Sequence, residues 1–515
     1  MSTALTVIAA LHRAARAYPR KRAVVVNDRV LTFAEILERA DRLAAGLRHA
    51  GVSRGTKIAM LMGNRIEFPE IYFGVLKTGA TLVVLNARLK GPEVSALIRK
   101  SEARWLIFAG ELSGVVSALD AVTRQQLTLV ALGGSGAPAS IAYDSLQCAS
   151  PRADAATEVS EADDACILFT SGTTGTPKGV LLTHRNVLFQ AINHVVEWDV
   201  RFDDVDLYPA PLCHGGGLAT LPRTILAGNT LVLMESFDAR SFATLLERER
   251  VTRAILVPTM CARILDLPDA LFARARSLRL IVTGGAILPF DLKMRLIERF
   301  PGVGVCDSYG QTEATGSVAC LKPGDALRKP GSIGRAFFLN DIRLFDEQDA
   351  EVPAGEVGEI VVRGPTVMRG YCGELEASAQ TLRNGWLHTG DLARQDEDGC
   401  LYIVGRKKDM IISGGINIYP REIEDVLCAH PGILEAAVIG VADPVWGESV
   451  KALVVPGPGV ELRADEVIDF CRQRLAGYKK PRSVELVDSL PKNSLGKTLK
   501  AELRRKFGAV FEHEP

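Results

Sequence analysis

The sequence predicts an α/β protein whose largely parallel sheets are covered by helices on both faces. The first observation is a series of short, nearly continuous apolar runs rich in β-branched residues, the pattern of strands buried on both sides. Amphipathic helical patterns separate these runs, which is the second observation. The clearest runs are "KIAMLM" at 57, "TLVVLN" at 81, "ACILFT" at 165, "RAILVP" at 253 and "LRLIVTGG" at 278.

The chain opens with a predicted helix that Pro19 ends, and "RAVVV" at 22 then predicts a strand. The opening segment is basic and has no acidic residue before Asp28, a composition that a mitochondrial transit peptide shares. We favour the ordinary helix because apolar residues recur at helical spacing, namely Val7, Ile8, Leu11 and Ala15.

The pattern changes twice toward the C-terminus. From about residue 330, short strands alternate with Gly and Asp turns, which predicts a β-rich subdomain. The last hundred residues then mix helical and strand patterns, beginning with "YPREIEDVLCAHPG" at 419, and predict a compact α+β domain. Charged residues and glycines break the strand pattern between Gly405 and Gly415, so we expect the domain boundary there.

Composition bounds the partners and the compartment. Lys and Arg number 61, as do Asp and Glu, so no net field draws the chain to nucleic acid or to an anionic membrane. No apolar run approaches the ~20 residues that span a bilayer, so we expect no integral membrane association. Ten irregularly spaced cysteines without a CxxC pair predict inert thiols in a reducing, cytoplasmic setting.

The segment "ILFTSGTTGTPKGV", residues 167–180, is the most unusual in the chain. Glycines let backbone N–H groups turn toward an anion, hydroxyls add donors, and Lys178 adds a mobile positive charge. It is not a Walker A loop, because Pro177 precedes the lysine and Gly179 follows it. The alternative is a solvated connector before a helix capped by Thr183. We favour a site for a triphosphate.

"TSGTTGTPKGV" resembles the phosphate-binding signature of the adenylate-forming superfamily, which includes acyl- and aryl-CoA synthetases, peptide-synthetase adenylation domains and firefly luciferase. Further motifs follow in that family's order and cover residues 170–500. They are "PLCHGGG" at 211, "TGGAILP" at 283, "DSYGQTE" at 307, "GEIVVRGPTVMRGY" at 358, "GWLHTGD" at 385, "GRKKDMIISGG" at 405 and "PKNSLGKTLK" at 491.

The resemblance implies a two-step reaction: a carboxylate attacks the α-phosphate of ATP to give an acyl-adenylate and pyrophosphate, and a thiol then takes the acyl group and releases AMP. Cations and oriented donors suit such a crowded anionic centre. The implied catalytic residues are Lys497, His214, Thr312, Glu313 and Lys178, with Glu313 as the Mg2+ ligand. Without the motifs, Lys497 is more often a solvated lysine, and a lone His214 is more often structural.

The resemblance also implies the nucleotide contacts. Tyr309 would stack on adenine and Asp391 would accept the ribose hydroxyls, while Arg406 is either a second nucleotide contact or a surface charge. An isolated Tyr309 would otherwise be core packing. The full implied set is Thr170, Ser171, Gly172, Thr173, Thr174, Gly175, Lys178, Gly284, Gly285, Ala286, Asp307, Ser308, Tyr309, Gly310, Gln311, Thr312, Asp391 and Arg406.

Two domains follow from the same resemblance: residues 1–408 form the adenylation domain and residues 409–515 a mobile domain that carries Lys497. Asp409 matches the hinge, whose charged, glycine-flanked surroundings allow large dihedral changes. The segment of Ser413, Gly414 and Gly415 would reach the coenzyme A tunnel after the domain swings. Lysines of "AGYKKP", residues 476–481, are either phosphate contacts for coenzyme A or simply solvated.

We therefore expect an acyl-CoA synthetase that uses ATP, Mg2+ and coenzyme A. Small and apolar positions around 214–218, 257–260 and 284–286 predict a hydrophobic monocarboxylic acid, either fatty, alicyclic or aromatic. Cys213 stands where relatives often carry a bulky aromatic residue, which would widen the acyl tunnel. The alternatives are a ligase that loads a carrier protein and a catalytically silent nucleotide-binding regulator. A homodimer is one of the oligomeric states open.

Overall fold

The computed structural model describes residues 5–133, 140–147, 158–170, 177–492 and 498–508 of the chain. It divides into two compact units, which we describe separately. Unit 1 comprises Met1–Asp341 and Val362–Leu387, and unit 2 comprises Ile342–Val361 and His388–Pro515. The expected α/β class with a large N-terminal part and a smaller C-terminal part is confirmed. The expected boundary between residues 408 and 409 lies within unit 2 and stays a prediction.

An eight-stranded sheet in unit 1 carries the glycine-rich segment. Its order is β19-β9-β8-β4-β3-β5-β6-β7, and all pairs from β8 to β7 are parallel. The pairs β8–β9 and β9–β19 are antiparallel. The strands are β3 (Lys57–Leu61), β4 (Thr81–Leu85), β5 (Trp105–Ala109), β6 (Thr128–Leu132), β7 (Ile141–Ala142), β8 (Asp164–Thr170), β9 (Lys178–Thr183) and β19 (Gly370–Tyr371).

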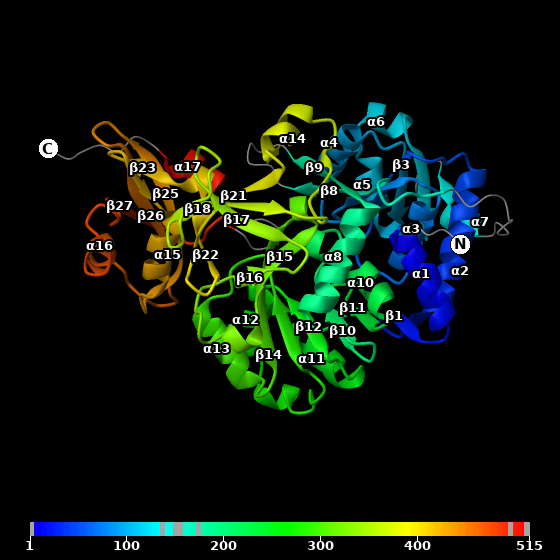
Figure 1. Cartoon of the computed structure of the whole chain (residues 1–515), viewed down its shortest axis with the longest axis horizontal. Coiled ribbons are helices and arrows are strands. Elements are labelled where there is room, and N and C mark those ends of the chain that lie inside the picture. The colour runs from blue at the N-terminus through cyan, green and yellow to red at the C-terminus, as the bar shows by residue number, and fades with distance from the viewer. Residues whose placement is uncertain (1–4, 134–139, 148–157, 171–176, 493–497, 509–515) are drawn as a thin grey trace. The chain divides into compact units, whose positions relative to one another are not determined.

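The second sheet of unit 1 has nine strands in the order β16-β15-β14-β13-β12-β10-β11-β1-β2 (Figure 1). Its middle six strands are parallel, and antiparallel strands close both edges. The strands are β1 (Arg22–Val26), β2 (Arg29–Thr32), β10 (Val205–Tyr208), β11 (Thr230–Leu233), β12 (Arg253–Leu256), β13 (Leu280–Thr283), β14 (Gly304–Gln311), β15 (Gly316–Leu321) and β16 (Arg335–Ala336).

Helices cover both faces of the nine-stranded sheet. On one face, Phe242, Ile264 and Leu296 from three helices pack with strand residues such as Ile281. On the other face, Trp198 packs with the alternate residues of the same strands, whose side chains point to the opposite side of the sheet. The helices of unit 1 are α1 (Val7–Ala17), α2 (Phe33–His49), α3 (Phe68–Lys77), α4 (Gly91–Ser101), α5 (Ser113–Ser117), α6 (Ala121–Gln125), α7 (Tyr143–Gln147), α8 (His184–Glu197), α9 (Gly215–Leu218), α10 (Thr220–Ala227), α11 (Ala239–Arg248), α12 (Pro258–Leu265), α13 (Phe290–Arg299) and α14 (Leu375–Thr381).

Helix α8 begins where the sequence predicts. The Thr183 hydroxyl accepts a hydrogen bond from the Asn186 backbone N–H, and the Asn186 side chain accepts one from the Thr183 N–H, which is a reciprocal cap. The Asn186 amide also donates to the backbone oxygens of Pro365 and Val367, at 2.8 Å each. The same residue therefore caps a helix and fastens the segment that leads to β19.

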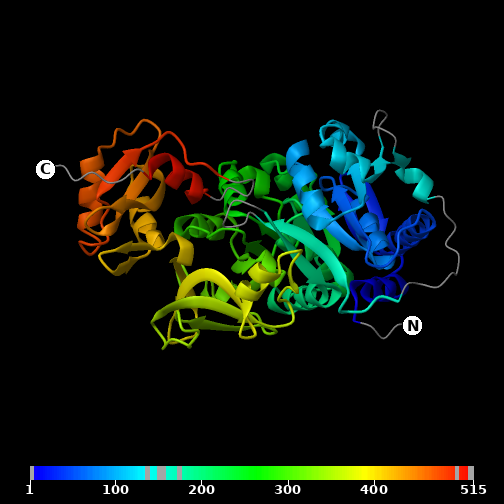
Figure 2. The ribbon, with the colours of Figure 1, turned by 90° about the horizontal axis from the view of Figure 1, so that it is seen from above.

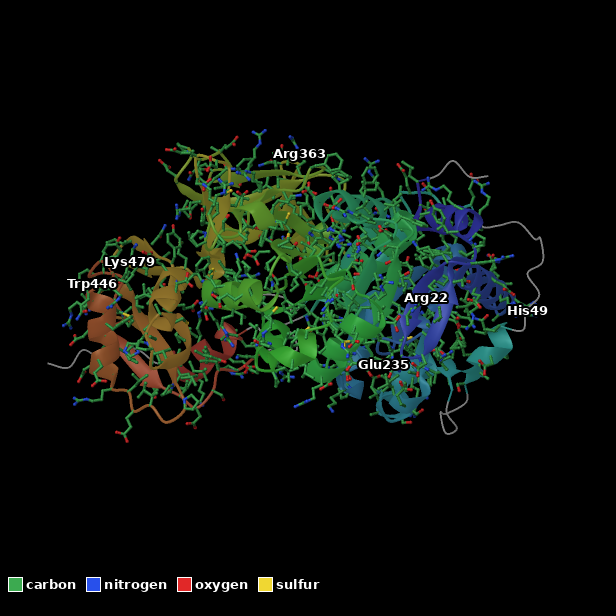
Figure 3. All side chains as sticks on the ribbon, turned by 90° about the horizontal axis from the view of Figure 1, so that it is seen from below. Arg22, His49, Glu235, Arg363, Trp446 and Lys479 are labelled. Carbon is green, nitrogen blue, oxygen red and sulfur yellow. The ribbon has the colours of Figure 1, made fainter. Side chains whose placement is uncertain are left out.

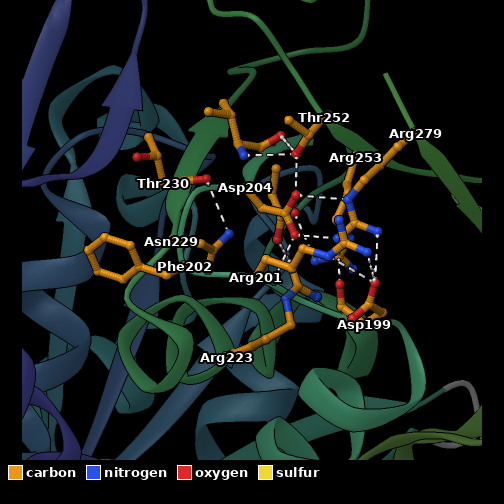
Figure 4. A network of polar contacts seen from close by, with 12 residues as sticks. Asp199, Arg201, Phe202, Asp204, Arg223, Asn229, Thr230, Thr252, Arg253 and Arg279 are labelled. Carbon is orange, nitrogen blue, oxygen red and sulfur yellow. Dashed lines mark hydrogen bonds and ion pairs between the residues drawn. The ribbon is translucent and has the colours of Figure 1, made fainter. Parts of the chain in front are cut away.

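Two guanidinium groups share one carboxylate inside unit 1. Arg223 donates to Asp206 Oδ2 at 2.7 Å, and Arg253 Nη1 lies 3.0 Å from Asp206 Oδ1. All three side chains are at most 1% exposed, and Figure 4 shows the two arginines with the neighbouring Asp204. Burial and these two positive charges hold the pKa of His194 well below its ordinary value. The imidazole is therefore neutral at pH 7.

We expect Asp206→Ala to lower the free energy of unfolding by about 3–5 kcal/mol, because it leaves two buried guanidinium groups without their carboxylate. Denaturant unfolding followed by fluorescence measures this loss. Glu38→Ala is the control, because Glu38 pairs with Arg42 on the exposed side of α2 and such a pair contributes about 0.3–0.5 kcal/mol. Equal, small losses in both variants would contradict the buried pairing.

A five-stranded sheet, most of whose residues belong to unit 2, has the order β17-β18-β21-β20, and β22 also pairs with β21. This sheet agrees with the β-rich texture predicted from about residue 330. Its strands are β17 (Asp341–Phe345), β18 (Val357–Arg363), β20 (Leu382–Arg383), β21 (Trp386–Gln395) and β22 (Leu401–Arg406).

The C-terminal part of unit 2 is an α+β body around a second five-stranded sheet. Helices α15 (Pro420–Cys428) and α16 (Ala464–Arg472) pack on one face, and α17 (Lys500–Phe507) packs on the other. Figure 2 shows the strands in orange with α17 in red beside them. The strands are β23 (Ile411–Ser413), β24 (Ile416–Ile418), β25 (Ile433–Asp443), β26 (Gly447–Pro456) and β27 (Ser483–Leu486).

Two expectations from composition can be compared with the described residues. None of their helices has the length and apolar character that crossing a membrane requires. The nine described cysteines are free thiols, all buried except Cys428, as the irregular spacing predicts. Cys148 lies outside the described residues.

Candidate functional site

The glycine-rich segment joins two antiparallel strands of the eight-stranded sheet. Thr170 ends β8 and Lys178 begins β9, and the two residues are direct partners in the ladder. The predicted phosphate contacts between them, Ser171, Gly172, Thr173, Thr174 and Gly175, lie outside the described residues. The structure therefore fixes the positions of the two residues that flank the predicted phosphate contacts, and it shows that the lysine extends from the first residue of β9.

Lys178, Tyr371 and Glu313 meet although they are far apart in the sequence. The Lys178 Nζ lies 4.6 Å from the centroid of the Tyr371 ring. The Tyr371 hydroxyl donates a hydrogen bond to Glu313 Oε1 at 3.0 Å. Burial, and next the charge of Glu313, raises the pKa of Tyr371, so its hydroxyl stays protonated and remains a donor at neutral pH.

Glu313 and Thr312 lie in a 3-10 turn, Thr312–Ala314, that follows β14. The backbone oxygen of Glu313 accepts a hydrogen bond from the Met368 N–H at 2.8 Å, which fixes the turn against the segment just before β19. A half-buried carboxylate on a fixed turn suits Mg2+, which takes one or two carboxylates and completes its shell with phosphate oxygens and water. Among the described residues, no three His, Cys, Asp or Glu side chains gather at one metal site.

The "PLCHGGG" motif lies beside the same turn. A Cβ atom placed on Gly215 would lie 3.3 Å from the Thr312 hydroxyl, so the glycine backbone passes close to the predicted phosphate contact. His214 is the residue before helix α9. Burial, and next the charge of Arg88, lowers the pKa of His214 from its ordinary 6.5. The imidazole is therefore neutral at pH 7.

The segment Gly284–Ala286 follows β13, at the carboxyl end of the parallel sheet where ligands commonly bind in α/β folds. Gly285 has φ +80°, a left-handed conformation that favours glycine. A Cβ atom on Gly284 would lie 3.3 Å from the Ser308 carbonyl oxygen. The structure thus places residues 284–286 against β14, and the sequence predicts nucleotide contacts from both segments.

The predicted nucleotide residues from Asp307 to Gln311 are the last five residues of β14. Asp307 accepts a hydrogen bond from the Thr283 hydroxyl at 2.6 Å and forms an ion pair with the buried Lys293 of α13. The strand bulges between Tyr309 and Gly310 where it pairs with β15. A Cβ atom on Gly310 would overlap the carbonyl oxygen of Gly316, so this position requires glycine.

In unit 2, Asp391 and Arg406 are direct partners on β21 and β22. Arg406 Nε lies 2.9 Å from Asp391 Oδ1, and Asp391 is only 5% exposed. The Asp391 N–H donates to the Thr389 hydroxyl, and the Gly390 N–H donates to Glu359 at 2.9 Å. Both predicted contacts therefore form one ion pair between β21 and β22, beside hydrogen bonds to Thr389 and Glu359.

The predicted hinge residue Asp409 ends a 3-10 turn, Lys407–Asp409, and its carboxylate accepts from Arg504 of α17 at 2.7 Å. Ser413 ends β23, and Gly414 and Gly415, with φ +56° and +79°, form the two-residue turn to β24. Two central residues with positive φ are typical of a type I′ hairpin. The predicted catalytic Lys497 lies outside the described residues.

The Trp446 ring lies beside this hairpin in unit 2, and a basic side chain lies against the ring. A Cβ atom on Gly414 would lie 2.7 Å from the Trp446 ring, and the Gly414 N–H donates to the Trp446 oxygen at 2.8 Å. The Arg482 guanidinium lies 5.1 Å from the Trp446 ring centroid. Trp446 is 43% exposed, and Figure 3 labels it together with Lys479 of the "AGYKKP" segment. Lys479 pairs with Glu422 of α15 at 2.7 Å.

Sequence reasoning missed three residues of this arrangement. Tyr371 was visible as the last letter of "GPTVMRGY", but nothing in its spacing indicates a contact with Glu313. Lys293 lies on the buried face of an amphipathic helix, and a lysine among apolar positions was its only signal. Trp446 lies in a turn without a motif and carried no signal of its relation to Gly414.

The family of AMP-binding enzymes is the class that this fold and these motifs define. The family model described as AMP-binding enzyme matches residues 11–372, and the model for the AMP-binding enzyme C-terminal domain matches residues 422–497. The chain belongs to this family, the adenylate-forming superfamily expected from the motifs.

Named relatives narrow the class. Feruloyl-CoA synthase of an Amycolatopsis species is 43% identical over 96% of this chain and 98% of its own length. Indoleacetate–CoA ligase of Aromatoleum aromaticum is 38% identical over 95% of each chain. O-succinylbenzoate coenzyme A synthetase of Bacillus subtilis, solved with ATP and a magnesium ion, matches with TM-score 0.83 and 31% identity over 96% of this chain and 99% of its own. The protein is an ATP-dependent, AMP-forming acid–thiol ligase.

We expect the His214 imidazole to titrate below 6.5, and Arg88→Gln to raise its pKa toward that value by removing a positive charge. Burial remains in the variant, so the pKa should stay below the ordinary value. NMR titration of the imidazole C2 proton, assigned with His214→Gln, measures both values. An unchanged or lowered pKa in Arg88→Gln would contradict the electrostatic contribution of Arg88.

Proposed function

We propose that the protein activates a hydrophobic monocarboxylic acid with ATP and Mg2+ and transfers the acyl group to coenzyme A. The observation that carries the proposal is the meeting of Lys178, Tyr371, Glu313 and Thr312 at the end of the glycine-rich segment. An ammonium group, a hydroxyl and a carboxylate on three separate chain segments form a site for a metal-bound polyphosphate.

Adenylation would depend on cations and hydrogen-bond donors that are in position around the α-phosphate before the reaction begins. An oxygen of the acid attacks the α-phosphorus, and the bond to the bridging oxygen of pyrophosphate breaks. Negative charge grows on the phosphoryl oxygens, and Lys178 and the Thr312 hydroxyl would stabilise it. Glu313 would hold Mg2+, which neutralises phosphate charge when bound. Lys497 would bring a second ammonium to the same centre.

We assign the nucleoside to the remaining predicted residues. Gly284–Ala286 follow β13, Tyr309 lies near the end of the neighbouring parallel strand β14, and both would contact adenine. In unit 2, one carboxylate can accept hydrogen bonds from both hydroxyls of a ribose. Asp391 is supported for this role by its hydrogen-bonded place in β21 and by its ion pair with Arg406.

The acid would lie near His214, since the glycine-rich backbone after it passes Thr312. A neutral imidazole beside Gly215–Gly217 accommodates an apolar group without placing a charge in its path. Two of the similar relatives, feruloyl-CoA synthase and indoleacetate–CoA ligase, are named for aromatic acids. We therefore favour an aromatic monocarboxylate over a fatty or alicyclic one.

For coenzyme A, the supporting features are the Gly414–Gly415 turn and the exposed ring of Trp446 beside Arg482. An exposed aromatic face suits stacking on an adenine ring, and a guanidinium group suits its phosphates. The free thiols of the described cysteines are compatible with the cytoplasmic location that we propose.

The test is release of pyrophosphate on addition of ATP, Mg2+ and single acids, from hydroxycinnamic and indolic acids to fatty acids of two to sixteen carbons. We expect release with hydrophobic monocarboxylates, highest with aromatic ones, and consumption of coenzyme A in step with AMP formation. Release without coenzyme A consumption would instead indicate a carrier-protein ligase. No release with any acid would indicate a silent nucleotide-binding protein.

Lys497→Ala should slow acyl-adenylate formation by about a hundredfold to a thousandfold, because it removes a charge from the transition-state anion. Thioester formation from supplied acyl-adenylate should be spared. Asp409→Pro should show the reverse pattern, because proline locks φ near −65° and obstructs the proposed swing. Single-turnover measurements of each step separate the two, and equal damage to both steps in either variant would contradict domain alternation.

A further inference from the structure

Tyr371 is anchored on both sides by backbone hydrogen bonds. In the ladder between β19 and β9, Tyr371 faces Val180 and Gly370 faces Leu181. The next residue, Cys372, donates its N–H to the Gly179 oxygen at 2.7 Å. The Tyr371 N–H itself donates to the Ser378 hydroxyl of α14 at 2.8 Å. The backbone from which the ring extends is therefore fixed on β19, opposite Val180 of the strand that begins at Lys178.

The face of the Tyr371 ring contacts the lysine, and the hydroxyl at its edge contacts the glutamate. Its face lies 4.6 Å from the Lys178 ammonium nitrogen, within the distance of a cation–π contact. Its edge carries the hydroxyl, which donates to Glu313 Oε1 at 3.0 Å. Tyr371 is only 8% exposed, so water competes weakly for either contact.

A lysine and a glutamate at one phosphate site can pair with each other instead of binding phosphate and metal. An ammonium and a carboxylate attract each other, and a direct ion pair would occupy the oxygens that a metal needs. An aromatic face attracts the ammonium without using a carboxylate oxygen. The hydroxyl donates a hydrogen bond that orients the carboxylate, as hydrogen-bonded partners of metal-ligating carboxylates do.

We infer that Tyr371 is a positioning residue that orients Glu313 for the divalent cation of the nucleotide through its hydroxyl, and Lys178 for phosphate through its ring. The inference rests on the proposed function, because Glu313 is assigned there to Mg2+ and Lys178 to phosphate. The two roles belong to different parts of one side chain, so substitutions can separate them.

The experiment measures binding rather than turnover. Mn2+ is titrated into the full-length protein with ATP present and no acid, and free Mn2+ is followed by electron paramagnetic resonance. Tyr371→Phe keeps the ring and removes the hydroxyl, so Mn2+ affinity should fall about tenfold to a hundredfold. ATP affinity without a divalent cation, measured by calorimetry, should stay within about twofold of the wild type. Tyr371→Leu should weaken both affinities.

Tyr143→Phe is the matched control. The Tyr143 hydroxyl also donates to a buried glutamate, Glu70, at 2.8 Å, but α7 and α3 carry no predicted site residue. Its Mn2+ affinity should equal that of the wild type. An equal loss in Tyr143→Phe and Tyr371→Phe would show a general effect of deleting a buried hydroxyl and would overturn the inference.

The remaining outcomes also decide. Unchanged Mn2+ affinity in Tyr371→Phe overturns the role of the hydroxyl. Loss of cation-free ATP binding in Tyr371→Phe overturns the separation of the two roles, since it indicates a disrupted site. If the wild-type protein binds neither Mn2+ with ATP nor ATP alone, the proposed function itself fails, and that result is distinct from a failure of the Tyr371 inference.

Discussion

The pairing of β19 with β9 is the constraint on which the candidate site of unit 1 depends. It consists of two residue pairs, yet it joins the strand that begins at Lys178 to a segment almost two hundred residues later in the chain. Without it, neither Tyr371 nor the Met368 N–H, which holds the Glu313 turn, would reach the phosphate end of the sheet. The fold places these residues by backbone hydrogen bonds, and the side-chain chemistry follows from that placement.

Charge in this chain is balanced overall and arranged locally. Lys and Arg equal Asp and Glu at 61 each, so no long-range field selects a partner. Inside the described part of the fold, several buried charges meet opposite ones: Arg223 and Arg253 meet Asp206, Lys293 meets Asp307, and Asp391 meets the partly exposed Arg406. Asp307, Asp391 and Arg406 of the last two pairs are predicted nucleotide contacts. A buried ion pair contributes little net stability but fixes geometry when its partners are well placed.

The fold class and the site motifs could be predicted from the sequence because each depends on short, local stretches of residues. Buried parallel strands are continuous apolar runs, and the Thr183 cap is a local hydrogen bond. The Tyr371–Glu313 and Asp391–Arg406 contacts could not be predicted, because each depends on a strand register that no local pattern encodes. The bulge at Tyr309 and Gly310 is of the same kind: its reason, the close approach of Gly316, appears only when two strands are side by side.

The contact of Asp409 with Arg504 bears on how the proposed swing takes place. Arg504 belongs to α17, which packs on the C-terminal sheet through Leu503. Rotation about φ of Asp409 carries its side chain along with the residues that follow, so the ion pair with Arg504 is preserved. Rotation about ψ leaves the side chain behind and breaks the pair. Since both partners are mostly buried, breaking it would cost more than a surface pair contributes. The geometry therefore favours φ of Asp409, or a bond before it, as the axis of the movement.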